Sequence, residues 1–258
     1  MKQVMYGTVS ALALVLALGG VAKANDHHHA KSEAAIAGAF TGAGVVGNGA
    51  VYNAILGDNE IDDHAFTNAT GAFNIGQNAS INSAVQQSMA IAAVVNTDGS
   101  DTVKEGSNEL ALAAAGGYNF VGCNDACLTL LGGGNEIENA AFEYATGAFQ
   151  ILQNRSVNSA VSQSMAIGAV VNTDGRDANT FGNQTALAVS ALGADVVGNH
   201  AGGTLTLPNL FDSFTNNNVI TDSSFQHATG AFNVLQNASL NSSVQQGMAI
   251  GAVVNTAH

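Results

Sequence analysis

The chain has 258 residues, of which 47% are hydrophobic, with one proline, no tryptophan and a formal net charge of −13. Six basic residues cannot neutralise a useful number of phosphates, so the composition argues against nucleic-acid binding. Proline cannot donate a hydrogen bond to a β ladder, and its near absence leaves long stretches of the chain able to pair as strands.

The N-terminal segment 1–24 has the order of a secretory signal peptide. Lys2 precedes an apolar run over Val9–Val21, and Ala22–Ala24 has the small-x-small form of a cleavage site. We expect cleavage after Ala24 and export of the mature chain. An N-terminal membrane anchor is the alternative, although the apolar run is shorter than the ~20 residues that a spanning helix needs.

The N-terminal segment of the mature chain, 25–58, carries a short histidine run, His27, His28 and His29. Such a run can bind copper, nickel or zinc, and a solvated tail without metal is the alternative. Ile36–Gly57 is uncharged and rich in glycine, which permits its interpretation as a membrane span. Its asparagines make it only weakly hydrophobic, and we expect no stable span in the mature chain.

Three repeats follow this segment. Ala69–Thr97 returns at Ala145–Thr173 and at Ala228–Thr256, with twenty of 29 positions identical in all three copies. Matching residues upstream extend each copy. The chain therefore divides into repeat 1 at 59–97, linker 1 at 98–134, repeat 2 at 135–173, linker 2 at 174–217 and repeat 3 at 218–256.

A shorter shared motif precedes each repeat. Val45–Asn48, Phe120–Cys123 and Val196–Asn199 align through a Val-Gly pair. The larger unit therefore joins a variable half to a nearly constant half. Insertions in the variable half are typical of loops on a repeated scaffold.

The constant half has a period of two. From Phe73 to Ser88, odd-numbered residues are mainly apolar and even-numbered residues are mainly small and polar, which predicts extended strands. The run is too long for one strand, so we expect bends at its Asn-Ala-Ser or Asn-Ser stretches. A helix over Ser83–Val95 is the alternative, and Glu109–Ala115 and Thr185–Leu192 suit a short helix as well as a strand.

We therefore predict an all-β or mainly β fold, a three-repeat β-solenoid or cross-β stack in which short helices in the linkers are an alternative. Stacked rungs place identical side chains about 4.8 Å apart, and a ladder of amides satisfies groups that are otherwise costly to bury. Solvated turns of an ordinary repeat protein are the other explanation for the repeated amides. The columns expected in the fibre core are Phe73, Phe149 and Phe232; Gln77, Gln153 and Gln236; Asn78, Asn154 and Asn237; Asn82, Asn158 and Asn241; Gln87, Gln163 and Gln246; and Met89, Met165 and Met248.

The third copy runs to Thr256 without a distinct polar repeat after it. Solenoids that stay monomeric end in capping repeats, and an uncapped edge exposes backbone groups that template another chain. The sequence therefore predicts self-association.

The repeats resemble those of secreted bacterial functional amyloids of the Fap type, and more distantly those of curlin. The shared features are a Thr-Gly start, spaced asparagines, a Gln-Gln pair and an Ala-rich end. They stand in this chain at Thr70-Gly71, Asn74, Asn78, Asn82, Gln86-Gln87 and Ala90-Ile91-Ala92, with Ser162-Gln163 in place of Gln-Gln in the second copy. The resemblance implies a fibre subunit of a biofilm matrix, exported through the outer membrane and nucleated at the cell surface by dedicated machinery.

Two cysteines, Cys123 and Cys127, lie in the first linker. In a strand their Cα atoms lie about 13 Å apart, beyond the ~7 Å that a disulfide allows, whereas in a turn they can pair. A local disulfide, a cross-link between subunits and a metal site therefore all stay open, and an exported location permits the first two.

The remaining chemistry is sparse. Asp58, Glu60, Asp62 and Asp63 can bind calcium loosely or form a solvated turn, and the chain has no EF-hand or nonapeptide calcium pattern. It also lacks a Gly-x-Ser-x-Gly elbow, a His-Glu-x-x-His motif and a phosphate loop. We expect no enzyme and no cofactor.

These observations predict the structural subunit of an extracellular, amyloid-like fibre that assembles as a homopolymer by templated strand stacking. A monomeric β-solenoid adhesin or surface-layer component is one alternative. A secreted membrane-active protein is another, motivated by Ile36–Gly57.

Overall fold

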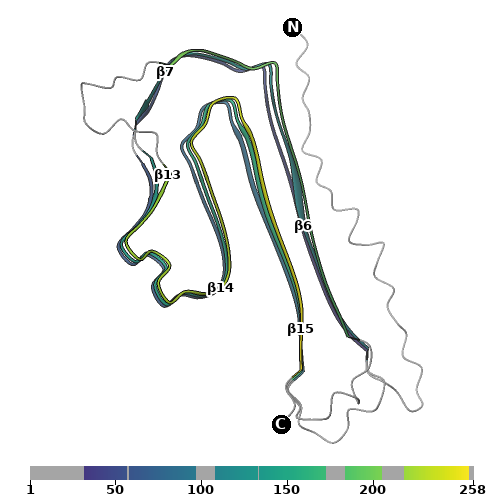
Figure 1. Cartoon of the computed structure of the whole chain (residues 1–258). Helices are drawn as coiled ribbons and strands as arrows, with labels where there is room; N and C mark the ends of the chain where they lie inside the picture. Colours follow the sequence, from purple (N-terminus) through teal and green to yellow (C-terminus); the bar gives the residue numbers. More distant parts are fainter. Residues whose placement is uncertain are drawn as a thin grey trace, which may run out of the picture.

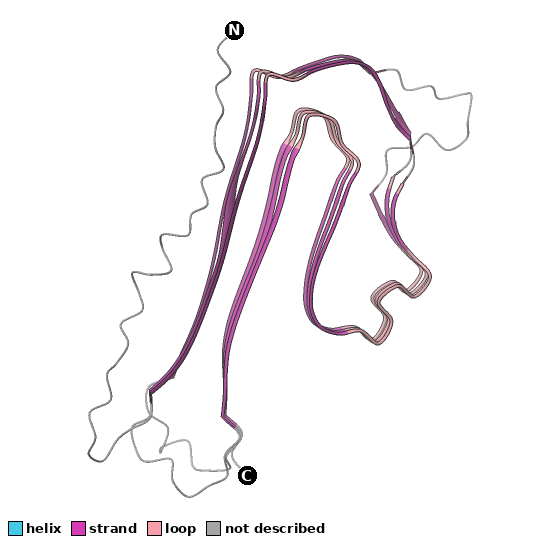
Figure 2. Ribbon diagram, turned by 180° about the vertical axis from the view of Figure 1, so that it is seen from behind, coloured by secondary structure: helices cyan, strands magenta, loops and turns pink. Residues whose placement is uncertain are grey.

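The computed structural model describes residues 32–56, 58–96, 108–132, 134–172, 184–204 and 218–255. Within these ranges every regular element is a β-strand, and the strands form five parallel three-stranded sheets. Figure 2 shows only strands and connecting loops among the described residues. The prediction of an all-β fold is confirmed.

The strands form three rungs, each made of five strands in the same order. The first rung contains β1 (Ser32–Val46), β2 (Gly49–Leu56), β3 (Asn59–Ile61), β4 (Thr70–Asn78) and β5 (Ala84–Asn96). The second contains β6 (Asn108–Gly122), β7 (Asp125–Gly132), β8 (Asn135–Ile137), β9 (Thr146–Asn154) and β10 (Ala160–Asn172). The third contains β11 (Gln184–Val197), β12 (His200–Thr204), β13 (Asn218–Ile220), β14 (Thr229–Asn237) and β15 (Ser243–Asn255).

Each rung follows the same flat, winding path, and the three paths lie over one another (Figure 1). A long strand (β6 in the second rung) leads to a corner, and β7 crosses the top of the view. The chain then turns back through a short strand and a compact set of turns. The last two strands run side by side in opposite directions, so that β15 lies alongside the sheet that contains β6.

The strands pair in register with their counterparts in the next rung. The offset in sequence between the first and second rungs is constant, as shown by Ser32 beside Asn108 and Thr70 beside Thr146. Between the second and third rungs the offset is larger in the repeats, where Thr146 pairs with Thr229, than in the preceding strands, where Glu109 pairs with Gln184. The extra length therefore falls between β12 and β13, in the variable half, and the stacking of the repeats is unaffected by it.

The long period-two run breaks where the sequence predicts. Residues 79–83 separate β4 from β5, and the equivalent bends stand in the other rungs. Asn82, Asn158 and Asn241 have positive φ angles of 51°, 54° and 49° there. Asparagine tolerates this left-handed conformation better than most residues, which explains its presence at the bend in all three copies.

The linkers belong to the stack. Glu109–Ala115 lies in β6 and Thr185–Leu192 lies in β11, so the helical alternative for both is wrong, as is a helix over Ser83–Val95. In the stack β6 pairs with β1 on one side and with β11 on the other, and Ile36–Leu56 lies in β1, the corner that follows it, and β2. None of the described residues forms a helix with the length and hydropathy to cross a membrane.

Two sheets pack face to face through very small side chains. The buried cluster between the sheet of β1, β6 and β11 and the sheet of β5, β10 and β15 consists of alanines and two valines. A Cβ atom built on Gly168 stands 2.7 Å from the carbonyl oxygen of Leu187 on the facing strand. Alternating alanine and glycine therefore let the two backbones approach closely, which explains the composition of these strands.

The shared Val-Gly motif lies at equivalent places in the three rungs, but its predicted alignment is wrong by one residue in the second rung. Val45 pairs with Val121 and Val196, so Cys123, and not Gly122, occupies the column of Gly47 and Gly198. This corner needs a positive φ angle, which is 72° at Gly47, 55° at Cys123 and 64° at Gly198. Cys123 has the positive φ angle that glycine usually adopts. Because the column of Gly47 and Gly198 has a cysteine in the second rung, an alignment by glycine is shifted there by one residue.

Candidate functional site

The middle rung is buried by its two neighbours, and the outer rungs are each covered on one side. In β9 the stretch Ala148–Asn154 is buried throughout, whereas in β4 no residue is buried. Among the described strands, those of the first and third rungs pair on one side only. The candidate site is therefore the pair of outer faces, defined as the side of the first rung and the side of the third rung that point away from the second.

The Gln77, Gln153 and Gln236 column forms a continuous amide ladder, as predicted. The Nε2 of Gln153 donates to the Oε1 of Gln77 at 2.7 Å, and the Nε2 of Gln236 donates to the Oε1 of Gln153 at the same distance. Each Nε2 also donates to the backbone of the neighbouring short strand, at Glu60 for Gln77 and Glu136 for Gln153. The ladder thus holds β4, β9 and β14 against β3, β8 and β13.

A second ladder follows one residue later. Asn154 donates to Asn78 and Asn237 donates to Asn154, each through Nδ2 to Oδ1 at 2.8 Å. Asn154 is fully buried, and a buried amide without partners is costly. The repeated asparagine therefore serves the stack.

A third ladder was missed by sequence reasoning. The Nδ2 of Asn59 donates to the Oδ1 of Asn135 at 2.9 Å, and the Nδ2 of Asn135 donates to the Oδ1 of Asn218 at 2.8 Å. Asn59 and Asn135 also donate to the backbone oxygens of Asn154 and Asn237. The signal was available, because an asparagine opens each repeat.

The Gln87 column is the fourth ladder and runs in the opposite sense to the Gln77 column. Gln87 donates to the Oε1 of Gln163 at 3.0 Å, and Gln163 donates to the Oε1 of Gln246 at 3.5 Å. Gln87 also donates to the backbone oxygen of Ile75, which ties β5 to β4. Two positions later, Met165 is fully buried between Met89 and Met248 in the same register.

Two phenylalanine columns form the apolar centre beside the amides. Phe73, Phe149 and Phe232 stack with ring centroids 4.8 and 4.9 Å apart, as predicted for their column. The aligned Phe66, Phe142 and Phe225 stack at 4.9 and 5.0 Å and meet the first column edge to face. Stacked and edge-to-face aromatic pairs contribute energy beyond the area that they bury.

The second rung contains a buried charge in a column where the other two rungs have alanine. Arg155 is fully buried where the other rungs have Ala79 and Ala238, and its Nη1 lies 3.9 Å from the Oδ1 of Asp58 in the first rung. Asp58 also accepts the backbone N–H of Gly134. Burial lowers the pKa of the Arg155 guanidinium, and the Asp58 carboxylate opposes that shift.

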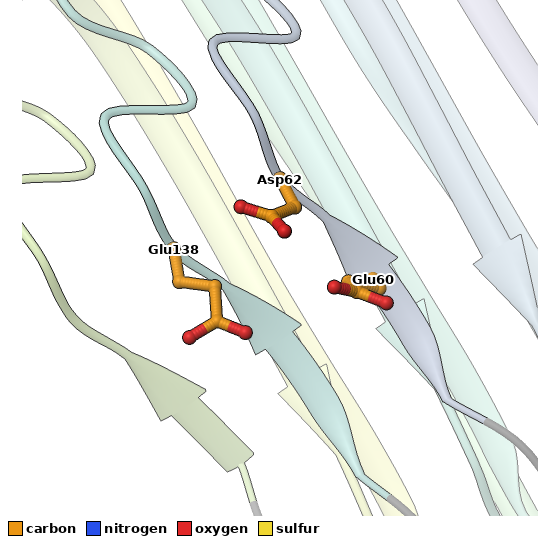
Figure 3. Close-up of side chains that lie close together, drawn as sticks. All are labelled: Glu60, Asp62 and Glu138. Carbon is orange, nitrogen blue, oxygen red and sulfur yellow. The ribbon is translucent and has the colours of Figure 1, made fainter.

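Three carboxylates gather at the ends of the short strands (Figure 3). Glu60 and Asp62 come from the first rung and Glu138 from the second, and one oxygen of each lies within 4.8 Å of the others. Carboxylate oxygens are the ligands that calcium prefers, but exposed acidic groups commonly stand together without an ion. Of the four acidic residues that the sequence suggested, the group includes Glu60 and Asp62 and leaves out Asp58, which lies beside Arg155, and Asp63.

Two glutamates at this place in the stack, Glu60 and Glu136, have raised pKa values. Loss of solvent raises the pKa of Glu60, and a hydrogen bond with Asp62 and repulsion by Asp62, Glu136 and Glu138 raise that pKa further. Loss of solvent also raises the pKa of Glu136, as does repulsion by Asp58 and Glu138. In-register stacking thus places like charges over one another, and protonation relieves the repulsion.

We therefore expect the folded chain to be more stable against denaturant at about pH 5 than at about pH 7.5. A carboxyl group with a raised pKa in the folded state stabilises it most below the ordinary value of 4.5, and this contribution is lost as the pH rises through the raised pKa. The measurement is the urea midpoint at each pH. The double variant Glu60→Gln, Glu136→Gln isolates these two groups from the general negative charge, and an unchanged pH dependence in that variant would contradict their role.

The remaining candidates stay predictions. Cys123 is a free, exposed thiol at the corner between β6 and β7, and Cys127 follows within β7. His27, His28 and His29 and the predicted signal peptide 1–24 lie outside the described residues.

Comparison with known protein families, with curated proteins and with solved structures finds no match.

Proposed function

We propose that this protein is the structural subunit of an extracellular fibre, which grows by stacking three-rung subunits end to end. The observation that carries the proposal is the difference between the rungs. Identical columns of Phe, Gln and Met are buried in the second rung and half-buried in the first and third. A further copy on either outer face continues every column and buries it.

The exposed apolar side chains of the outer rungs support the same proposal. Ile91 and Val95 in β5 are 38% and 58% exposed, and Val253 and Val254 in β15 are each 45% exposed. In the second rung the valine equivalent to Val253 is fully buried. Apolar edges of paired strands are sites at which another chain adds.

The place of action follows from the leader and from the likeness of the repeats to Fap-type subunits. Both support export, and we assign the fibre to the matrix of a bacterial biofilm at the cell surface. The partners are then other copies of the chain and the secretion and nucleation machinery of the outer membrane. The acidic mature chain keeps the unassembled subunit soluble during export.

The test is assembly of residues 25–258 after dilution from denaturant. Thioflavin fluorescence with a lag that preformed seeds abolish, and fibre reflections near about 4.8 and 10 Å, are the expected results. A stable monomer that seeds do not convert would contradict the proposal and favour the monomeric solenoid adhesin, with the three rungs as its complete fold.

The Gln77 ladder provides a sharper test of the same proposal. We expect the triple replacement of Gln77, Gln153 and Gln236 by alanine to slow seeded fibre growth by at least about tenfold, because unmade amide bonds at each new layer cost about 1–3 kcal/mol. The matched control replaces Thr70, Thr146 and Thr229 by alanine. These residues lie in the same three strands, and all three are exposed. Equal growth rates for the two triple variants would argue against the ladder.

A further inference from the structure

We propose that the outer face of the third rung binds the outer face of the first rung of another copy in one orientation only, so that the fibre is polar. This inference rests on the proposed self-assembly and adds which two surfaces meet. Three observations support this inference: the four amide ladders, the outline of the rung and the distribution of carboxylates.

Two ladders leave donors on the first rung and acceptors on the third. Gln77 accepts through Oε1 and Gln236 donates through Nε2, so a second Nε2 hydrogen of Gln77 and the Oε1 of Gln236 have no partner within the described residues. Asn78 likewise accepts through Oδ1 and keeps both Nδ2 hydrogens, and Asn237 keeps an Oδ1 lone pair. Stacking the first rung on the third joins donor to acceptor in both columns.

The other two ladders run the opposite way and match equally well. Asn59 and Gln87 donate to the second rung, and their side-chain oxygens have no partner in the described part of the chain. Asn218 and Gln246 accept from the second rung and keep amide hydrogens for a further layer. All four columns therefore continue across the joint with the directions that they have inside the subunit.

The outline of the rung excludes the joining of like faces. Two first rungs meet face to face only after a half-turn about an axis in the plane of the rung. That turn reverses the strands that run across the axis and moves those that run along it to the other side of the axis. Equivalent columns then no longer lie over one another, because the winding path is not symmetric (Figure 1). The in-register parallel pairing seen between all three rungs is possible only with the third rung on the first.

The carboxylates favour this same joint. Glu60 and Glu136 repel each other inside the subunit, and the third rung has Val219 in their column. In the same way, the third rung has Thr221 in the column of Asp62 and Glu138. A third rung therefore meets a first rung with neutral residues opposite two of its carboxylates, whereas two first rungs bring acidic faces together.

One column does not follow this rule. Asp63 and Asp222 both stand at an exposed turn, where they place a carboxylate on each side of the joint. Exposed like charges are screened by salt, so we expect fibre growth to quicken as salt is added.

The backbone identifies a residue at which the first face can be blocked. The N–H of Thr146 donates to the oxygen of Ala69, and the N–H of Thr229 donates to the oxygen of Ala145, each at 2.8 Å. The N–H of Thr70 accordingly points out of the first rung. Thr70→Pro removes this donor and puts a ring in the joint, and the substitution spares the bonds to the second rung because proline is tolerated at the first residue of an edge strand.

Ser243 provides the equivalent block on the third face. The N–H of Ala84 donates to the oxygen of Ser159, and that of Ala160 to the oxygen of Ser242, at 3.0 and 2.9 Å. The N–H of Ser243, the first residue of β15, therefore points out of the third rung. Thr70→Ala and Ser243→Ala are matched controls, since they keep the N–H groups and are expected to form fibres as the unaltered chain does.

The experiment mixes the two proline variants and measures mass by analytical ultracentrifugation. Each variant alone is expected to stay monomeric, and the equimolar mixture is expected to form a dimer with one copy of each. Dimers of a single variant, or no dimer in the mixture while the unaltered chain forms fibres, would overturn the inference. Failure of the unaltered chain to form fibres would overturn the proposed function instead.

A second measurement covers the case in which a proline variant folds poorly. Growth of single fluorescent seeds in unaltered protein is followed while a substoichiometric amount of one variant is added. Each variant is expected to stop growth at one end, the two variants at opposite ends. Growth stopped equally at both ends by either variant would contradict a polar fibre.

Discussion

Replacement of Phe149 by alanine is expected to lower the free energy of unfolding of the monomer by about 3–5 kcal/mol. Phe149 is fully buried, stacks on Phe73 and Phe232, and meets Phe142 edge to face at 5.6 Å. Its loss opens a cavity in the middle rung that its neighbours cannot fill, because they are held in register by their own strands. Urea denaturation followed by circular dichroism measures the change.

The matched variant is Phe73→Ala, in the same column but half-covered at the outer face. In the monomer it is expected to cost clearly less than Phe149→Ala, because one side of the ring contacts solvent. In the fibre the two costs are expected to converge, since a further copy covers Phe73. Equal costs in the monomer would show that the first rung is already covered and would contradict the open outer face.

Removal of the Asp58 carboxylate is the second change with a large expected effect. Asp58→Ala leaves Arg155 buried without its carboxylate and leaves the N–H of Gly134 without its acceptor. We expect a loss of about 1–3 kcal/mol in the free energy of unfolding, the cost of leaving the buried N–H of Gly134 without its acceptor. Asp58 is itself 41% exposed, so water replaces part of the interaction.

The second-site variant Arg155→Ala is expected to rescue Asp58→Ala. The other rungs already have Ala79 and Ala238 in that column, and removal of both members of a buried ion pair costs less than removal of one. The double variant should therefore be more stable than Asp58→Ala alone in the same urea titration. Additive losses would contradict the pairing of these two residues.

Much of the fold could be predicted because identical residues recur at a nearly fixed spacing. The pairing of Phe73, Phe149 and Phe232 follows directly, since in-register stacking is the arrangement that places all three alike. Apart from the short Val-Gly motif, the linkers show no such recurrence. Their alanine-rich strands suit a helix by intrinsic propensity, and packing between two close sheets decides for strand.

The candidate site was predicted in part, for reasons that particular residues show. The repetition of Gln77 and Asn78 in each copy predicts their ladders. The Asn59 ladder was not predicted, because its strand is very short. The pairing of Arg155 with Asp58 could not be found, since each residue breaks the repeat and they lie far apart in sequence. The direction of each amide ladder depends on side-chain rotamers, which no sequence pattern encodes.

The most direct test of the account is electron cryo-microscopy of fibres formed by residues 25–258. The predicted result is layers about 4.8 Å apart, grouped in threes so that each subunit rises about 14 Å along the axis, with the third rung of one copy on the first rung of the next. A fibre in which each chain contributes a single layer, or in which like faces meet, would contradict it.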